Sequence, residues 1–353
     1  MKVRVGNACW HAAHVTDAYV AQEAGFFAEE GLDTEIVSGS IYTEGIKASR
    51  PGDYRYDESP YVLRDMIRFN IDIVTDVELA TVCLDKIRSQ GELRIIGVWR
   101  NRLVAAMMGA PHVKTLADLK GKRIGIWVKG TEVGRLIELQ LRKGGLDPAT
   151  DVEWVVGYKF GSNREAAGPL CEGKTDAAIV RIDWASKLQE EGFTKLVDFL
   201  EVYPHGRPAR LTVARQSFID RNPEIIKRYW KAAIRAHHFI RIVPEHYPFL
   251  RYCEAKQRTN NPDENEMQRN LMPMSMYESW HSSMNGQPSM QGLADHLQES
   301  KETGKVPASF TFEQLQSMLR LELVQEAWEE LCQRDETKQN LERIQPLIER
   351  FGF

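Results

Sequence analysis

Hydrophobic positions along the first two thirds of the chain alternate between the twofold period of a strand and the longer period of a helix. Predicted strands cover residues 3–8, 34–37, 71–75, 93–99, 103–108, 123–128, 152–156, 177–180, 196–199 and 210–214. Predicted helices cover residues 16–30, 59–69, 78–88, 116–119, 132–143, 164–172 and 184–191. This alternation predicts α/β architecture, with mainly parallel sheets covered by helices on both faces. From Pro223 onward the pattern is helical.

The strands and helices fall into two successive sets, which are linked by extended crossings near residues 100–105 and 203–212. A chain of 353 residues exceeds one ordinary core, since domains hold about 100 to 200 residues each. We therefore predict a discontinuous first lobe of residues 1–101 and 206–353, and a second lobe of residues 102–205. Ligands of open α/β sheets bind beyond the carboxyl ends of the strands, so a cleft between the lobes is the expected site.

Charge and composition exclude several classes of partner. The chain has 46 Lys and Arg against 50 Asp and Glu, so it lacks the basic excess of a nucleic-acid-binding protein. No apolar run approaches the ~20 residues that cross a bilayer, so no membrane insertion is expected. There is no CxxC, HExxH, P-loop or GxGxxG motif, and we expect neither a metal nor a cofactor.

The five cysteines are an odd number and widely scattered, which favours free thiols in a reducing compartment. The first residues already alternate like a strand and leave no room for a signal peptide. Both observations predict a cytoplasmic protein. The alternative is a periplasmic protein from which a signal peptide was removed.

Four sequence blocks carry a resemblance to a known family. They are residues 14–33, residues 116–125, residues 173–180 with Trp184, and Asn222-Pro223-Glu224 before a helix. They resemble the sulfonate-, nitrate- and taurine-binding proteins and the thiamine-pyrimidine synthases, over about residues 1–240. The resemblance implies a two-lobed type II periplasmic-binding-protein fold, here with a helical C-terminal extension. That fold serves both importers and enzymes, among them aryl-sulfinate desulfinases and dihydroxyphthalate decarboxylases.

The loop after the first predicted strand carries Cys9, Trp10, His11 and His14. A thiol near a helix N-terminus and beside imidazoles has a lowered pKa, so it suits a nucleophile or an acid. The desulfinases also place a cysteine at the end of their first strand, which the resemblance implies for Cys9. The alternative is that Cys9 is a small buried residue and that Trp10 stacks on a ligand.

The loop after the second predicted strand also offers polar groups. Ser38, Gly39 and Ser40 follow the second strand and can offer N–H groups and hydroxyls to an anion, with Tyr42 nearby. The alternative is an ordinary turn between a strand and a helix.

Asp76 and Glu78 follow the third predicted strand, where they could bind a cationic or hydroxylated group or supply a general base. The alternative for Glu78 is to stabilise the N-terminus of the next helix. Arg100, at the first crossing, could clamp a carboxylate, or it could be a surface hinge residue.

In the second lobe, Lys129, Gly130 and Thr131 join a strand to a helix and form an anion site from free N–H groups and a hydroxyl. A simple N-cap by Thr131 is the alternative. Arg181, Asp183 and Trp184 follow the last strand of that lobe and are further ligand candidates.

Two features of the helical region are expected to be structural. Adjacent histidines such as His237 and His238 point about 100° apart on a helix, so we predict packing roles for both. Apolar residues recur at helical spacing over residues 311–353, a pattern that usually packs on the parent lobe. A homodimer contact through these helices is the alternative.

These observations predict a cytoplasmic, cofactor-free enzyme that closes on a small aromatic or heteroaromatic organic acid and catalyses a lyase or hydrolase reaction such as decarboxylation or desulfination. The alternative is the solute-binding component of an ABC importer for a sulfonate, carboxylate or pyrimidine-like ligand. Only in that case is a permease the partner.

Overall fold

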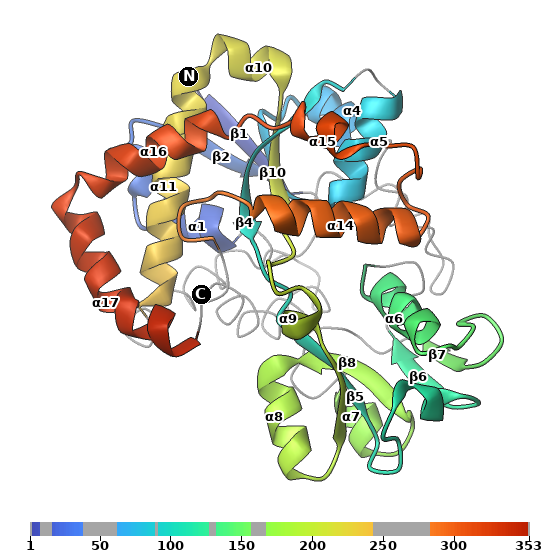
Figure 1. Ribbon diagram of the computed structural model, residues 1–353. Coiled ribbons are helices and arrows are strands. Elements are labelled where there is room, and N and C mark those ends of the chain that lie inside the picture. Colours follow the sequence, from blue (N-terminus) through green and yellow to red (C-terminus); the bar gives the residue numbers. More distant parts are fainter. Residues whose placement is uncertain are drawn as a thin grey trace. The chain divides into compact units, whose positions relative to one another are not determined.

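The computed structural model describes residues 2–7, 16–37, 62–88, 91–126, 132–156, 167–242 and 283–351 (Figure 1). The chain divides into two compact units, each with its own sheet. Unit 1 takes the described residues up to Arg102 and those from His205 onward, and unit 2 takes Leu103–Pro204.

Unit 1 is built on a five-stranded sheet of order β2-β1-β3-β10-β4. Its strands are β1 (Lys2–Asn7), β2 (Asp33–Val37), β3 (Ile73–Val77), β4 (Leu93–Arg100) and β10 (Ala209–Arg215). All five residues of β3 are buried, as expected of a central strand that has helices on both faces. Strands β1, β2 and β3 pair in parallel, whereas β10 runs antiparallel to β3 and β4.

Unit 2 is built on a second five-stranded sheet, of order β7-β6-β8-β5-β9. Its strands are β5 (Ala105–Gly109), β6 (Arg123–Ile126), β7 (Glu153–Val156), β8 (Ala177–Arg181) and β9 (Thr194–Asp198). Its helical segments are η2 (Leu116–Leu119), α6 (Glu132–Lys143), α7 (Ala167–Cys171), α8 (Ile182–Glu190) and α9 (Phe199–Val202). The core combines the buried strands with the apolar faces of α6 and α8.

One strand in each sheet departs from the predicted parallel pattern. The antiparallel strand is β10 in unit 1 and β5 in unit 2, and each is the first strand after the chain enters or re-enters its unit. An entering strand has no preceding crossover helix in its own sheet, so nothing in the connection forces it to run parallel. The α/β class of the prediction is confirmed, and the sheets are mixed.

Helix α11 (Pro223–Arg241) is the longest helix described in unit 1 and packs along its core. The helix begins with Pro223. Proline suits the first position of a helix, because its fixed φ is already helical and an N–H there would have no partner within the helix. The helix contacts α1 (Thr16–Glu23), α2 (Phe26–Glu29), α16 (Glu322–Cys332) and α17 (Asp335–Phe351). The other helices in the described part of unit 1 are α4 (Val62–Arg68), α5 (Leu79–Arg88), α10 (Gln216–Arg221), α14 (Met290–Glu302) and α15 (Phe312–Gln316).

Two glycines shape this packing. Gly25 has φ 82° and separates α1 from α2, so the single helix predicted over residues 16–30 is in fact two. A left-handed residue breaks the helical hydrogen-bond ladder, and glycine adopts that conformation at little cost. Gly97 lies in β4 under the indole of Trp230, where a Cβ would overlap the ring. The absence of a side chain there lets α11 approach the sheet.

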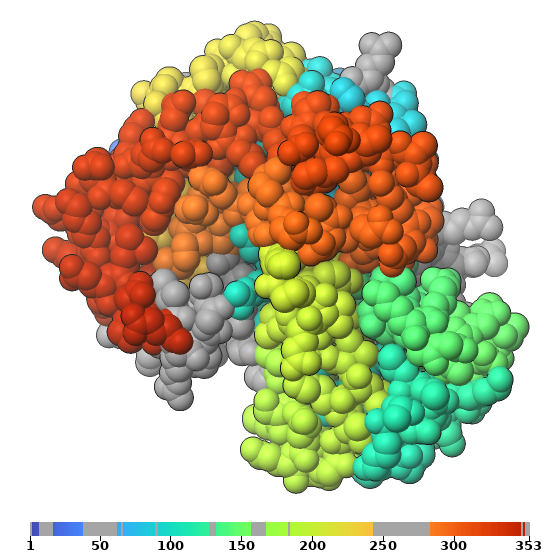
Figure 2. Space-filling view, viewed as in Figure 1, coloured from blue at the N-terminus to red at the C-terminus, as the bar shows by residue number. Residues whose placement is uncertain are grey.

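The C-terminal helices pack on unit 1. Leu323, Val324, Ala327 and Leu331 of α16 are buried in the same core as α11. In Figure 2 the orange and red residues from α14 to α17 form much of the visible face of this unit. The apolar stripe therefore packs on its own lobe, as the sequence predicts. No helix in the described ranges is long and apolar enough to cross a membrane.

Candidate functional site

Charged and aromatic residues gather at the carboxyl edge of the unit 1 sheet. Strands β1, β3 and β4 all end at this edge, because β10 is antiparallel to both β3 and β4. Antiparallel β10 therefore begins there, with Ala209 paired to Arg100. Open α/β sheets bind ligands at the carboxyl edge, so this edge is the candidate ligand site of unit 1.

Asp76 and Arg210 form an ion pair across this edge. Asp76 comes from the end of β3 and Arg210 from the start of β10, and the Arg210 guanidinium contacts Asp76 Oδ1. Asp76 has φ 63° and Arg210 has φ 62°. Left-handed backbone in residues other than glycine costs about 1 to 3 kcal/mol and clusters at ligand sites. Two such residues, joined by an ion pair between their side chains, make this edge a candidate ligand site.

Arg100 and Glu78 lie at the same edge. Arg100 is the last residue of β4 and only 6% exposed, and its neighbour Asn101 accepts a hydrogen bond from the backbone N–H of Arg207. Glu78 is half-buried between the end of β3 and the first residue of α5. The predicted third strand thus extends two residues further, to Val77. Of the first-lobe candidates, Asp76, Glu78 and Arg100 are described, and the structure brings all three to one edge.

A buried acid and a buried histidine complete the edge. Asp17, in the first turn of α1, is 3% exposed, and its Oδ2 lies 3.5 Å from Nε2 of His237 on α11. The Trp99 ring packs on the His237 ring with centroids 3.3 Å apart. Burial, with a smaller contribution from the charge of Asp76, raises the pKa of Asp17 to about 7. Burial and the charge of Arg241 lower the pKa of His237 well below its ordinary value.

Hydrogen bonds fix His237 and its neighbour in place. His237 Nδ1 lies 3.3 Å from the carbonyl oxygen of Ser283, and His238 Nε2 lies 3.0 Å from that of Met284. Both rings are buried, and the packing role that the sequence predicts for the two histidines stays a prediction. Residue 283 also donates its backbone N–H to the Trp99 carbonyl, so the segment before α14 ties α11 to the end of β4.

Several predicted residues lie outside the described ranges, and their roles stay predictions. They are Cys9, Trp10, His11, His14, Ser38, Gly39, Ser40, Tyr42, Lys129, Gly130 and Thr131.

Unit 2 has its own carboxyl edge, where β8 ends at Arg181. Asp183 lies on the first turn of α8. Trp184 is partly buried against the core of unit 2, with Lys187 Nζ 4.9 Å from the centre of its ring. This cation–π contact gives Trp184 a packing role inside its own unit.

Three residues that the sequence argument did not select as ligand contacts stand at the unit 1 edge: Asp17, Arg210 and His237. Asp17 could have been selected from the sequence, because it is an acidic residue in the first turn of the helix that follows the first strand. Arg210 and His237 carried no local signal, because only strand pairing and helix packing bring them to this edge. Within the described ranges, no cluster of His, Cys, Asp or Glu is suited to hold a metal ion.

Comparison with known proteins agrees with this geometry. The family model described as "NMT1/THI5 like" matches residues 94–246. No curated protein sequence matches the chain. Three similar solved structures are the alkanesulfonate-binding protein SsuA from Xanthomonas axonopodis pv. citri bound to MOPS, the periplasmic nitrate-binding protein NrtA from Synechocystis PCC 6803, and the desulfurization enzyme DSZB.

The similarity extends over almost the whole of each chain. For SsuA the TM-score is 0.54 at 14% identity, covering 90% of this chain and 97% of that one. For NrtA it is 0.61 at 13% identity, covering 95% and 90%. For DSZB it is 0.56 at 14% identity, covering 93% and 99%. The fold is that of a type II periplasmic-binding protein with a helical C-terminal region. This is the fold that the sequence resemblance implies.

Proposed function

We propose that the protein is a solute-binding protein that captures a small organic anion at the carboxyl edge of the unit 1 sheet. The observation that carries the proposal is the meeting of Arg100 and Arg210 at that edge, where Ala209 pairs with Arg100. Guanidinium groups suit carboxylates, sulfonates and sulfinates, because their fork of N–H donors matches two oxygens. Asp76 holds Arg210 in position through their ion pair.

The names of similar structures support this class of ligand. Two of the three proteins described above are named as binding proteins, for alkanesulfonate and for nitrate. These names support a solute-binding role and a periplasmic location better than the cytoplasmic enzyme expected from the sequence, and an ABC permease as partner stays a prediction. The aromatic nature of the ligand and a homodimer contact remain predictions.

The test is isothermal titration calorimetry with alkanesulfonates, nitrate, aryl sulfinates and aromatic carboxylates. We expect one class to bind, and the Arg100→Gln variant to lose at least about tenfold in affinity, as expected for a lost charge-assisted hydrogen bond. Arg94→Gln is the matched control, since Arg94 lies on the same strand at the opposite edge of the sheet. Unchanged affinity in Arg100→Gln, or no binding by any of these anions, would overturn the proposal.

An enzyme that cleaves an aryl sulfinate is the second candidate. Similarity to the desulfurization enzyme DSZB favours it, together with the expectation that Cys9 is a nucleophile or acid. The reaction would convert an aryl sulfinate and water into the arene and bisulfite. Release of bisulfite from the wild type and its loss in Cys9→Ser would establish turnover. Binding without any bisulfite would leave the solute-binding role.

A further inference from the structure

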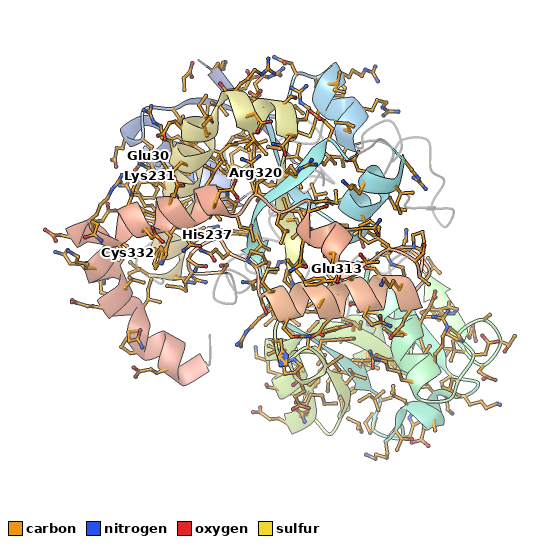
Figure 3. The ribbon with its side chains drawn as sticks, turned by 45° about the horizontal axis from the view of Figure 1, so that its top comes forward. Glu30, Lys231, His237, Glu313, Arg320 and Cys332 are labelled. Carbon is orange, nitrogen blue, oxygen red and sulfur yellow. The ribbon has the colours of Figure 1, made fainter. Side chains whose placement is uncertain are left out.

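Asp17 and His237 form a buried pair, and the described residues of unit 1 leave one polar atom of each side chain without a hydrogen-bond partner. Both residues are almost fully buried, and their facing atoms, Oδ2 and Nε2, are 3.5 Å apart. Among the residues that the structure describes, neither Asp17 Oδ1 nor His237 Nε2 has a hydrogen-bond partner. Leaving a buried polar atom without a partner costs about 1 to 3 kcal/mol, so two such atoms at one place require an explanation. His237, labelled in Figure 3, comes from α11, and Asp17 comes from α1.

The contacts of the imidazole determine what this pair offers. His237 Nδ1 faces the carbonyl oxygen of Ser283, and a carbonyl oxygen only accepts, so the ring proton is on Nδ1. Nε2 is then an acceptor. Asp17 Oδ2 lies 3.5 Å from Nε2, which is longer than a normal hydrogen bond, so a proton on Oδ2 satisfies Nε2 only weakly. Asp17 Oδ1 remains as an acceptor. The pair therefore calls for a hydrogen-bond donor.

The pair lies where a ligand would be. Trp99, next to the last residue of β4, packs on the His237 ring. The charge of Asp76 contributes to raising the pKa of Asp17. Arg210 holds Asp76, so the pair belongs to the same edge as the two arginines of the proposed anion site.

We propose that Asp17 and His237 determine ligand specificity by accepting a hydrogen bond from a hydroxyl group of the bound anion. The preferred ligand is then a small organic anion that also carries a hydroxyl. This inference rests on the proposed function, and it adds the second polar group of the ligand. Sites built to pair with a ligand hydroxyl reject the analogue that lacks it, because the buried protein groups are left unpaired.

The test compares pairs of anions that differ by one hydroxyl: ethanesulfonate with 2-hydroxyethanesulfonate, and benzoate with its three hydroxy derivatives. Calorimetry on the whole chain should show that at least one hydroxylated member binds about tenfold or more tightly than its partner, corresponding to one hydrogen bond. Asp17→Leu should abolish that preference, so that the two members of each pair bind within about twofold of each other. Asp17→Asn keeps an acceptor oxygen and should retain part of the preference.

Two further variants keep the test decisive. His237→Phe replaces the second polar side chain of the pair with an apolar ring. It therefore tests the pair even if Asp17→Leu does not fold. Glu23→Leu is the matched control, because Glu23 is at the other end of α1, and it should keep the wild-type preference. Equal affinity for both members of every pair would overturn the inference, as would an unchanged preference in Asp17→Leu and His237→Phe.

The outcome also separates this inference from the proposed function. If plain anions bind and depend on Arg100, but hydroxylated members gain nothing, the solute-binding role stands and the role of Asp17 and His237 fails. If no anion binds, both fail.

Discussion

Two buried acids contact the same helix and illustrate opposite solutions to the cost of burial. Asp17 on α1 and Glu30 just after α2 are 3% and 7% exposed, and each faces α11. Glu30 is surrounded by cations: Lys231 Nζ and Arg235 Nη1 lie 3.4 and 3.3 Å from its oxygens, and Arg334 pairs with both oxygens. Asp17 has a histidine in place of these cations (Figure 3 labels Glu30, Lys231 and His237).

The two acids consequently differ in pKa. Burial alone would raise the pKa of Glu30, but Arg334, Lys231 and Arg235 lower it from its ordinary value. Burial raises the pKa of Asp17 to about 7, and Asp76 adds to the effect. Glu30 stabilises the packing of the C-terminal helices as a paired anion. Asp17 is the kind of uncompensated group that is kept at functional sites.

The largest expected effect is the pH dependence of Asp17→Asn. The folded pKa of Asp17 is above its unfolded value of 3.8, so its contribution to stability is full below about pH 4 and is lost as pH rises through about 7. Asparagine keeps the donor role of the protonated acid at every pH. We therefore expect the variant to gain on the wild type between pH 4 and 8, by up to about 4 kcal/mol.

Urea unfolding at pH 4.5, 6 and 8 measures this gain. His237 itself adds an opposite trend, because a lowered histidine pKa costs stability as pH falls below 6.5. That trend is common to both proteins and cancels in their difference. Glu23→Gln controls for loss of a carboxylate from α1. A difference between wild type and Asp17→Asn that is constant with pH would show that Asp17 is ionised in both states.

Glu30→Gln should show the reverse behaviour. The variant leaves Arg334, Arg235 and Lys231 facing one another without their shared anion, and breaking a buried ion pair in this way costs about 3 kcal/mol. The lowered pKa of Glu30 means that its contribution is present above about pH 4.5 and is lost at more acid pH. Urea unfolding at pH 7 should show the full loss. A loss below about 1 kcal/mol would mean that solvent screens this network as it screens surface pairs.

The sequence predicted the elements of this fold better than it predicted the site. Helix α6 was predicted with the observed bounds, because its apolar face and its flanking loops are local features. The fold class was confirmed for the same reason, because turns that contain glycine and the alternation of strands with helices depend on residues close together in the sequence. The entering strands β5 and β10 carry no local mark of direction, so their antiparallel pairing could not be read from the chain.

The site depends on residues far apart in the sequence. Asp17 meets His237 only because α11 packs on α1, and a histidine pair on a helix looks the same whether it packs or recognises a ligand. Asp76 was identified because it follows a strand, whereas its partner Arg210 depends on the register of β10 against β4. Local chemistry therefore predicted candidate loops, and tertiary packing decided which side chains meet at the described edge.

A smaller effect is expected at the exposed end of the Glu30 network. Lys227 bridges Glu224 and Glu330 at 3.0 Å each, and both carboxylates are largely exposed. Exposed pairs of this kind contribute about 0 to 1 kcal/mol. Lys227→Met should therefore lose less than about 1 kcal/mol in urea unfolding, and any loss should shrink in high salt. A loss as large as that of Glu30→Gln would mean that the network acts as one unit.

The smallest expected effect concerns Glu78, which lies at the ligand edge but directly before the first residue of α5. A carboxylate at a helix N-terminus interacts with the free N–H groups of the first turn and contributes about 0.3 to 1 kcal/mol. Glu78→Gln should therefore lose about 0.5 kcal/mol of stability and keep the wild-type affinity for the anion. Unlike Asp17, Glu78 is only half-buried, so no ligand is required to satisfy it. A tenfold loss of affinity with unchanged stability would instead make Glu78 a ligand contact, and would extend the recognition surface from the Asp17–His237 pair to the start of α5.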